Sequence, residues 1–284
     1  MGIEKIAVLG AGQMGNGIAQ VAACAGYSVV MIDIKQEYVE AGLAAIEKSL
    51  ARLVAKERMT QTDADEALAL VSVSTEKSAA ADADLVVEAI PEIPELKFSV
   101  FAELDAICKP EAILASNTSS ISINEIAAAT NRPDKVIGMH FMNPVAIMRL
   151  VEIINGSETS EAVTAAVVEA SERMGKTALA CNDSPGFVSN RILCPMINEV
   201  LAHSDAAPGD WIELYNTTSE EIDLGGWFLS DDNVDLTKFQ IPPNTILPGG
   251  GHLVFNQRDH FGHLNNPRAR IPFGLSELGD EVIL

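Results

Sequence analysis

The chain has 284 residues, of which 48% are hydrophobic and 21% charged, and its formal net charge is −21. This length suffices for one large domain or two ordinary ones, and the apolar fraction excludes a wholly disordered chain. So acidic a chain is not expected to bind nucleic acid or an anionic membrane through a general basic surface. Because no run of about 18 apolar residues occurs and the first residues lack a secretory pattern, we expect a cytoplasmic protein.

The first 200 residues alternate short apolar runs with segments of helical period. Residues 5–9 (KIAVL) predict a strand, which a glycine-rich turn connects to a helix that ends near residue 25. Further strands are predicted at 28–32, 85–87, 112–115, 135–139, 148–154 and 177–181, and further helices at 39–54, 97–107, 123–129 and 161–174. Short apolar strands separated by amphipathic helices are typical of a parallel sheet with both faces covered.

A glycine motif, GxGxxG, lies between the first strand and the first helix. Gly10 permits the tight turn, Gly12 lets the backbone approach a pyrophosphate, and Gly15 lets helix and strand pack closely. Asp33 ends the second strand, where a carboxylate accepts hydrogen bonds from ribose hydroxyls and repels a 2′-phosphate. An ordinary glycine turn remains an alternative, but the whole pattern predicts an α/β, Rossmann-type, doubly wound and mostly parallel sheet that binds NAD.

His140 is the single histidine of the first 200 residues. It follows a predicted strand, at the edge where doubly wound folds bind their ligands. A neutral imidazole can take a hydroxyl proton while hydride leaves the same carbon. Glu152, in the next extended segment, could orient this imidazole and stabilise its protonated form. On spacing alone, a structural histidine is an equally good interpretation.

The composition changes near residue 200. Residues 1–200 carry 15 Lys and Arg against 27 Asp and Glu, whereas residues 201–284 carry 4 against 13, with both tryptophans and nine of the 20 glycines. Short strand candidates at 211–215, 227–229, 252–255 and 281–284 are separated by turn residues, which predicts a small all-β sandwich. We therefore predict two domains that join near residue 200.

Several residues that could suggest a metal site favour structural roles. Asp231, Asp232 and Asp235 fit a turn between strands better than a cation site. His260 and His263 have no third ligand at a suitable spacing, so zinc is not expected and we predict no metal.

The cysteines and tryptophans are likewise interpreted as structural. Trp211 and Trp227 are expected to anchor a core. The cysteines form no CxxC pair and are expected to be buried, reduced thiols: Cys24, Cys108, Cys181 and Cys194.

Five ordered motifs occur in residues 1–200: VLGAGQMGNGIAQ (8–20), DLVVEAIPE (84–92) with Lys97, SNTSS (116–120), HFMNPV (140–145) with LVE (150–152), and SPGFVSNR (184–191). With these motifs the segment resembles the N-terminal part of a 3-hydroxyacyl-CoA dehydrogenase, closest to the bacterial 3-hydroxybutyryl-CoA type. The resemblance implies NAD-dependent oxidation of L-3-hydroxyacyl-CoA to 3-ketoacyl-CoA, in fatty acid or butanoate metabolism.

The same resemblance implies roles for individual residues. His140 would be the general base and Glu152 its partner, and Ser119 and Asn190 would contact the region of the reacting oxygen. The implied cofactor contacts beyond the glycines are Asp33, Glu92, Lys97, Ser119 and Asn143. The implied coenzyme A contacts are Ser49, Lys56 and Ser119. For Ser49 and Lys56, an ordinary solvated helix face is an alternative.

From about residue 197 the chain resembles a lamin-tail domain, an immunoglobulin-like sandwich. The two resemblances imply domains at 1–196 and 197–284, the second of them incomplete. DWIELYN (210–216), DLGGWFLSD (223–231), the run 241–255 and LSELGDEVIL (275–284) carry this resemblance. The dehydrogenase family continues instead with a helical domain that forms the dimer and closes one side of the acyl site. We therefore expect the family's dimer interface to be largely missing, and the apolar residues from Phe187 to Met196 to be exposed. The partner of the sandwich is left open.

Two functions of different classes follow. The first is an NAD-dependent 3-hydroxyacyl-CoA dehydrogenase, which the set of His140, Glu152, Ser119 and Asn190 favours. The alternative is a chimeric, non-catalytic nucleotide-binding protein whose sandwich mediates protein interaction, which the replaced helical domain favours. A hydroxyacid dehydrogenase with a lysine catalyst is disfavoured by the HFMNP and SNTSS motifs.

Overall fold

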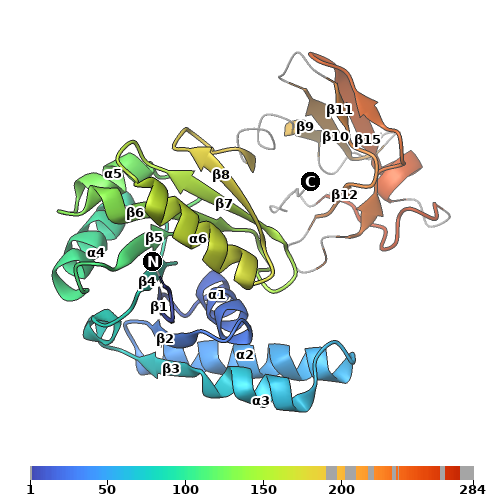
Figure 1. Ribbon diagram of the computed structural model, residues 1–284. Helices are drawn as coiled ribbons and strands as arrows, with labels where there is room; N and C mark the ends of the chain where they lie inside the picture. The colour runs from blue at the N-terminus through green and yellow to red at the C-terminus, as the bar shows by residue number, and fades with distance from the viewer. Residues whose placement is uncertain are drawn as a thin grey trace. The chain divides into compact units, whose positions relative to one another are not determined.

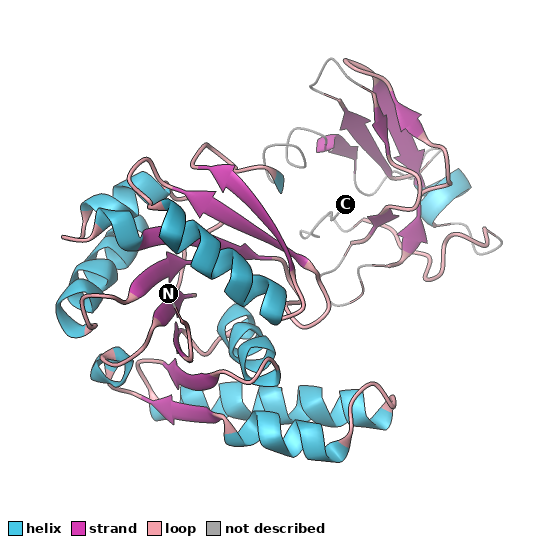
Figure 2. Cartoon of the chain, in the orientation of Figure 1, coloured by secondary structure: helices cyan, strands magenta, loops and turns pink. Residues whose placement is uncertain are grey.

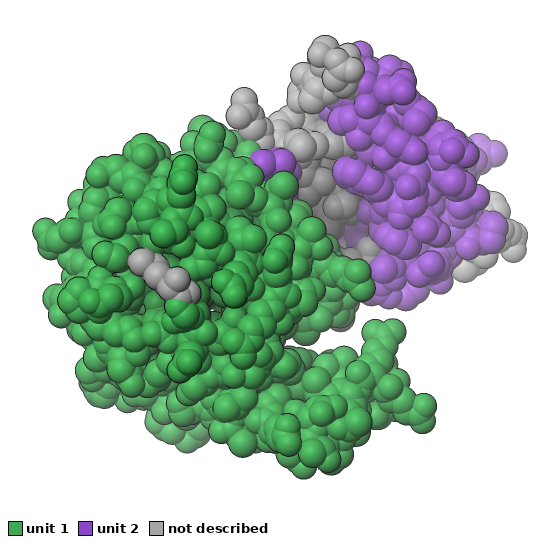
Figure 3. Space-filling model, in the orientation of Figure 1, with its two compact units in different colours: residues 1–187 green, residues 188–284 purple. Residues whose placement is uncertain are grey.

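The chain divides into two compact units, residues 1–187 and 188–284, and each is described by itself (Figure 3). The computed structural model describes residues 2–189, 197–201, 209–216, 221–231, 235, 237–262 and 266–275. In these ranges, no helix is both long enough and apolar enough to cross a membrane.

The first unit is built on one sheet with the strand order β3-β2-β1-β4-β5-β6-β7-β8 (Figures 1 and 2). Its strands are β1 (Lys5–Leu9), β2 (Ser28–Ile32), β3 (Val71–Ser74), β4 (Leu85–Glu88), β5 (Ile113–Ser116), β6 (Val136–Phe141), β7 (Leu150–Asn155) and β8 (Thr177–Asn182). Its helices are α1 (Gln13–Cys24), α2 (Gln36–Ala55), α3 (Gln61–Ala69), α4 (Pro94–Ile107), α5 (Ile123–Ala128) and α6 (Glu161–Arg173), with short 3₁₀ turns at Lys77–Ala80 and Pro133–Lys135. Neighbouring strands are parallel except β6 and β7. The predicted Rossmann-type, mostly parallel sheet is confirmed.

Helices cover both faces of this sheet because the central strands are apolar on both sides. In β1, Ile6 and Val8 join a core with α1, α2, α3 and α6, whereas Ala7 and Leu9 join a second core with α4 and α5. Successive side chains of a strand point to opposite faces, so one short apolar strand supplies both cores. The carboxyl ends of β1, β4, β5 and β6 meet at one edge, where such folds bind their ligands.

Two elements of the first unit were not predicted, α3 and β3. Helix α3 is short and polar, but Thr60 and Asp63 form a reciprocal capping box at its start, which is a signal that the sequence does carry. Strand β3 has only four residues, VSVS, at the edge of the sheet. Its alternating pattern is too short to stand out from a loop.

The prediction that Phe187 is exposed is wrong. The Phe187 side chain is 2% exposed and packs into the core beneath α4 and α5. The backbone turns at Gly186 and Phe187, both of which have positive φ, and this brings the ring into the core. Val188, which belongs to the same expectation, is half-buried. The other apolar positions of this expectation, 192, 193 and 196, lie outside the described residues.

The second unit contains short antiparallel pairings around its own core. Strands β10 (Trp211–Tyr215), β9 (Ile197–Leu201) and β15 (His252–Asn256) form one sheet with β10 in the middle. Two-stranded pairs join β11 (Ile222–Asp223) to β14 (Ile246–Leu247) and β12 (Phe228–Leu229) to β13 (Phe239–Gln240), and a π-helical turn covers Gln257–Phe261. These short antiparallel sheets confirm the predicted all-β character. The strand predicted at 281–284 lies outside the described residues.

The structure agrees only in part with the expected role of the tryptophans: Trp227 packs against the core of this unit without belonging to its fully buried centre. Trp211 and Trp227 are only half-buried, and the fully buried aromatic side chains of this core are phenylalanines. Trp211 alternates with the buried Ile212 and Leu214 along β10 and therefore points to the other face of the sheet.

The cysteine prediction also needs correction. Cys24, the last residue of α1, is exposed, whereas Cys108 is buried and Cys181 is half-buried. Burial, reinforced by the charges of Glu152 and Asp183, raises the pKa of the Cys181 thiol to about 11. Cys194 lies outside the described residues.

The residues that could have suggested a metal site have other partners. Asp231 pairs with Lys238, and the Asp235 carboxylate accepts hydrogen bonds within a turn. The His260 ring packs edge-on against two phenylalanines, and its burial lowers its pKa. Among the described residues, no three His, Cys, Asp or Glu side chains are arranged to hold a metal ion. Asp232 and His263 lie outside those residues.

Candidate active site

The glycine turn after β1 has the shape that a pyrophosphate requires. Gly10 has φ +97°, and a Cβ there would lie 2.5 Å from the Ala89 carbonyl oxygen. A Cβ on Gly15 would lie 1.7 Å from the Gly10 carbonyl oxygen, so helix α1 packs directly on the turn. Gly12 starts α1, and a Cβ there would meet no described atom within 4 Å. At Gly12 the helix start therefore has space for a phosphate group, whereas at Gly10 and Gly15 neighbouring backbone fills the space.

These environments predict different outcomes for two similar substitutions. Gly15→Ala is expected to cost about 1–3 kcal/mol of stability, because the contacted atom is rigid backbone. Gly12→Ala is expected to keep the parent's stability but to weaken NAD binding about tenfold or more, since its methyl group occupies the phosphate's space. Thermal unfolding and NAD titration of both variants test this. A Gly12→Ala chain that binds NAD as the parent does would contradict the assignment.

Asp33 supports the same turn from the end of β2. Its Oδ2 accepts a hydrogen bond from the Ala11 N–H at 2.7 Å, and its Oδ1 accepts one from the Ile34 N–H at 2.7 Å. Each carboxylate oxygen can accept a second bond, so the half-buried Asp33 can both fix the turn and receive ribose hydroxyls.

The register of β6 and β7 brings His140 and Glu152 together. The two residues are direct partners in this antiparallel pair, so their side chains lie on one face. His140 Nδ1 lies 2.8 Å from Glu152 Oε2, Glu152 is 0% exposed and His140 is 6% exposed. With Nδ1–H donating to this carboxylate, Nε2 is left to accept a proton. Phe187 packs edge-on against the imidazole and helps to hold it in place.

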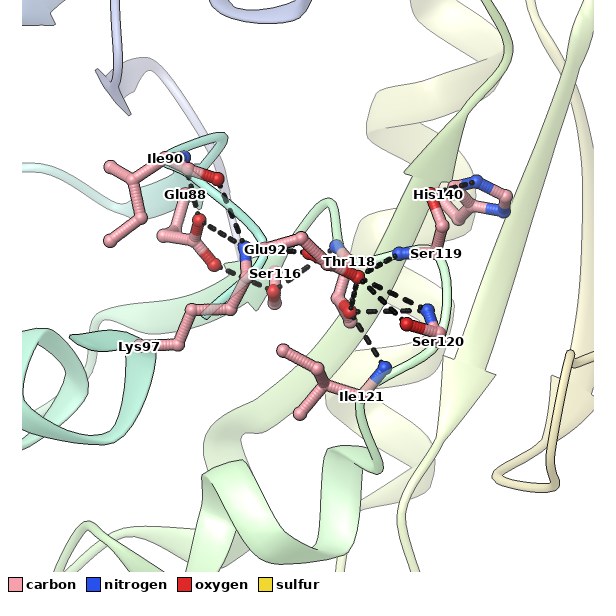
Figure 4. A network of polar contacts seen from close by, with 10 residues as sticks. All are labelled: Glu88, Ile90, Glu92, Lys97, Ser116, Thr118, Ser119, Ser120, Ile121 and His140. Carbon is pink, nitrogen blue, oxygen red and sulfur yellow. Dashed lines mark hydrogen bonds and ion pairs between the residues drawn. The ribbon is translucent and has the colours of Figure 1, made fainter. Parts of the chain in front are cut away.

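Ser119 lies at the open end of this dyad. It follows β5, it is exposed, and its Oγ is 3.2 Å from His140 Nε2 (Figure 4). A substrate hydroxyl that approaches Nε2 would therefore also meet the Ser119 hydroxyl.

Glu92 fixes the backbone of the Ser119 loop. Its Oε1 accepts hydrogen bonds from the Ser119 N–H at 2.8 Å and from Thr118 Oγ1 at 2.5 Å, and its Oε2 lies 3.2 Å from Lys97 Nζ (Figure 4). Partial burial raises the pKa of the Glu92 carboxyl, but the Thr118 hydrogen bond and the Lys97 charge outweigh this, so the pKa lies below its ordinary value. Glu92 is therefore a carboxylate at neutral pH.

Asn143 lies in the loop that follows β6. The residue is half-buried and is joined to Pro144 by a cis peptide bond. Two residues further on, Val145 packs against the α1 backbone, where a Cβ on Gly17 would come within 2.8 Å of it. The buried Lys176 ammonium donates to the carbonyl oxygens of Val145 and Met148. This loop is thus fixed between α1 and the start of β8.

The other predicted contacts lie elsewhere or are not described. Ser49 is half-buried on α2 and Lys56 is exposed at the C-terminal end of the same helix, two turns away. Asn190 lies outside the described residues. Sequence reasoning missed the buried Glu88 and Lys176. For Glu88, a charged residue directly after an apolar run is the signal that could have found it.

The glycine turn, the Asp33 carboxylate and the His–Glu dyad lie along one edge of a doubly wound sheet. Together they define a dehydrogenase that uses a dinucleotide.

The comparisons with known proteins agree with this class and narrow it. Residues 5–184 match the model of the 3-hydroxyacyl-CoA dehydrogenase NAD-binding domain. A Bacillus subtilis relative is 54% identical over 201 residues, which are 71% of this chain and 70% of the relative. The 3-hydroxybutyryl-CoA dehydrogenase of Bradyrhizobium diazoefficiens is 48% identical, over 70% of this chain and 68% of that enzyme. The chain belongs to the 3-hydroxyacyl-CoA dehydrogenase family, whose members are NAD-dependent oxidoreductases.

Structural comparison gives the same result for the first unit. The crystal structure of (S)-3-hydroxybutyryl-CoA dehydrogenase from Ralstonia eutropha superimposes with a TM-score of 0.68 at 48% identity, over 69% of this chain and 70% of that chain. Residues 195–284 match the model of the Lamin Tail Domain. Both sequence resemblances are thereby confirmed.

Proposed function

We propose that the chain oxidises L-3-hydroxyacyl-CoA to 3-ketoacyl-CoA with NAD, and that His140 is the general base. The observation that carries this proposal is the His140–Glu152 pair at 2.8 Å, with Ser119 Oγ at 3.2 Å from His140 Nε2. The names of the relatives support the substrate class, since they are 3-hydroxybutyryl-CoA dehydrogenases.

In the proposed mechanism, the residues of the first unit move one proton and hold the reacting oxygen. NAD, when bound, supplies the acceptor for the hydride from C3. His140 Nε2 takes the proton of the C3 hydroxyl as the hydride leaves, and the buried Glu152 carboxylate stabilises the resulting imidazolium. Ser119 donates a hydrogen bond to the same oxygen as it becomes a carbonyl. In the reverse direction His140 returns the proton.

The remaining predicted contacts complete this proposal. Lys97, Glu92 and Asn143 would face the nicotinamide half of the cofactor, and Asn190 would join Ser119 at the reacting oxygen. Lys56, as an exposed cation at the end of α2, would contact a phosphate of coenzyme A, with Ser49 on the same helix.

NADH formation from L-3-hydroxybutyryl-CoA tests the proposed function. Enzyme in excess over substrate reveals a slow reaction, and the D isomer provides the stereochemical control. We expect NADH from the L isomer only. Absence of NADH with NAD bound, or equal rates with both isomers, would refute the proposal.

Asp33 predicts a preference for NAD over NADP. A carboxylate beside the adenosine ribose accepts its hydroxyls and repels a 2′-phosphate, so we expect NAD to bind at least about tenfold more tightly. Asp33→Asn removes the charge but keeps an acceptor for the Ala11 N–H. It should therefore reduce the difference in affinity between NAD and NADP. Titration of both cofactors against both chains measures it. Equal affinity of the parent for NADP would show that Asp33 does not face the ribose.

The lamin-tail match favours a second candidate function, in which the first unit only binds nucleotide and the sandwich binds a protein partner. Such a chain would bind NAD with the preference described above but would form no NADH from either isomer. The NADH assay therefore separates the two functions.

A further inference from the structure

Glu88 is a buried carboxylate that the proposed mechanism does not use. It is the last residue of β4 and is 0% exposed. Its Oε1 lies 2.6 Å from Lys97 Nζ and accepts the Ile90 N–H at 2.7 Å, and its Oε2 accepts the Ser116 hydroxyl at 2.7 Å (Figure 4). With no exposed surface, Glu88 acts on a bound molecule only through its neighbours or through its charge.

Lys97 connects this carboxylate to a second one. Its ammonium is also buried, with 1% of the residue exposed, and lies 3.2 Å from Glu92 Oε2. Glu88, Glu92 and Lys97 form what we call the Lys97 cluster, in which two carboxylates share one ammonium. The cluster therefore carries one negative charge in excess.

The cluster lies next to the reacting groups. Glu92 accepts the Ser119 N–H, and Ser119 Oγ reaches the His140 imidazole. The carbon that loses hydride must lie beside His140, and the nicotinamide ring must lie beside that carbon. The nicotinamide ring accepts the hydride with its electron pair. The positive charge of the NAD⁺ ring is thereby lost, and the ring of NADH is neutral.

We propose that Glu88 sets the relative affinity of the site for NAD⁺ and NADH by giving the Lys97 cluster its excess negative charge. This inference rests on the proposed function, since it requires the nicotinamide to lie at the His140 end of the site. Negative charge there stabilises the cationic ring of NAD⁺ and leaves neutral dihydronicotinamide almost unaffected. Because Glu88 and Lys97 are buried, solvent screens this effect little.

Titration of NAD⁺ and NADH against two single variants of the cluster tests this charge effect. Glu88→Gln keeps the shape of the side chain and neutralises the cluster, so the ratio of the NAD⁺ to the NADH dissociation constant should rise about three- to tenfold. At an effective dielectric constant of about 20, two unit charges about 12 Å apart interact strongly enough to change a dissociation constant about tenfold. This sets the expected size of the shift. Lys97→Met makes the cluster more negative and should shift the ratio in the opposite direction, even as it weakens both affinities.

Glu103→Gln is the matched control. It makes the same change in net charge as Glu88→Gln, but on α4, the helix that carries Lys97, at a partly exposed side chain that pairs with Lys77. The ratio should stay at the parent's value. Thermal unfolding of each variant reports whether it is folded.

The double variant Glu88→Gln/Lys97→Met still tests the inference if Glu88→Gln does not fold. It leaves Glu92 as the one charge of the cluster, so its ratio should return to the parent's value although both affinities are lower. Three outcomes would overturn this inference but not the proposed function. They are an unchanged ratio in folded Glu88→Gln, a shift of the ratio in the same direction in both single variants, and a shifted ratio in the double variant. A parent chain that binds neither NAD⁺ nor NADH would overturn the proposed function as well.

Discussion

Replacement of His140 by alanine is expected to reduce turnover by about 10²–10⁴-fold, the range that general-base catalysis contributes. NAD affinity should stay nearly unchanged, because the imidazole contacts Glu152, Ser119 and Phe187 rather than the glycine turn. Rates of NADH formation at saturating NAD, together with the dissociation constant of NAD, measure the two effects separately.

His252→Ala provides the matched control for this substitution. It removes a half-exposed imidazole of the second unit, whose contacts are with Glu213 and Tyr215. Turnover should not change. Near-parent turnover in His140→Ala would place the base on a residue of another type, since residues 1–200 hold no second histidine.

The second large effect concerns the positioning of the acyl-CoA substrate for hydride transfer. We expect this 284-residue chain to turn over acetoacetyl-CoA with NADH at least about 10²-fold more slowly than the Bradyrhizobium diazoefficiens relative. About a third of that relative's length lies outside the match, and here residues 195–284 match a lamin-tail domain instead. A reacting carbon misplaced by about 1 Å can cost about 10²-fold.

Cofactor binding gives the internal control for that comparison. NAD affinity should differ only a few-fold between the two proteins, because the glycine turn and Asp33 belong entirely to the matched segment. Equal turnover from a monodisperse sample would show that the second unit supplies what the relative's remaining length supplies.

Much of the site could be predicted because short local patterns determine it. The glycine turn needs only a strand, three glycines and a helix start, and its sterics in the structure agree with the roles assigned to Gly10, Gly12 and Gly15. The pairing of His140 with Glu152 also depends on a register between two neighbouring strands. The sequence proposed this pair but left a structural histidine equally plausible, since spacing alone gives no antiparallel register.

The other features depend on contacts that are distant in the sequence. Glu88 and Lys97 meet across a strand end and a helix, and no periodic pattern reports that their charges are buried together. The burial of Phe187 depends on two consecutive residues with positive φ. The partial burial of Trp211 depends on which face of β10 packs on the core. The expectation for Phe187 came from the replaced helical domain, and the expectation for Trp211 came from its large apolar ring.

The most direct test of the central claim, that His140 oriented by Glu152 is the base of a dehydrogenase site, is a single-turnover measurement. The parent and His140→Ala, each in excess over L-3-hydroxybutyryl-CoA with NAD saturating, are compared for the rate at which NADH appears. We expect NADH from the parent, however slowly, and a rate about 10²-fold or more lower in His140→Ala. Equal rates in the two chains, or no NADH from a parent that binds NAD, would contradict the claim.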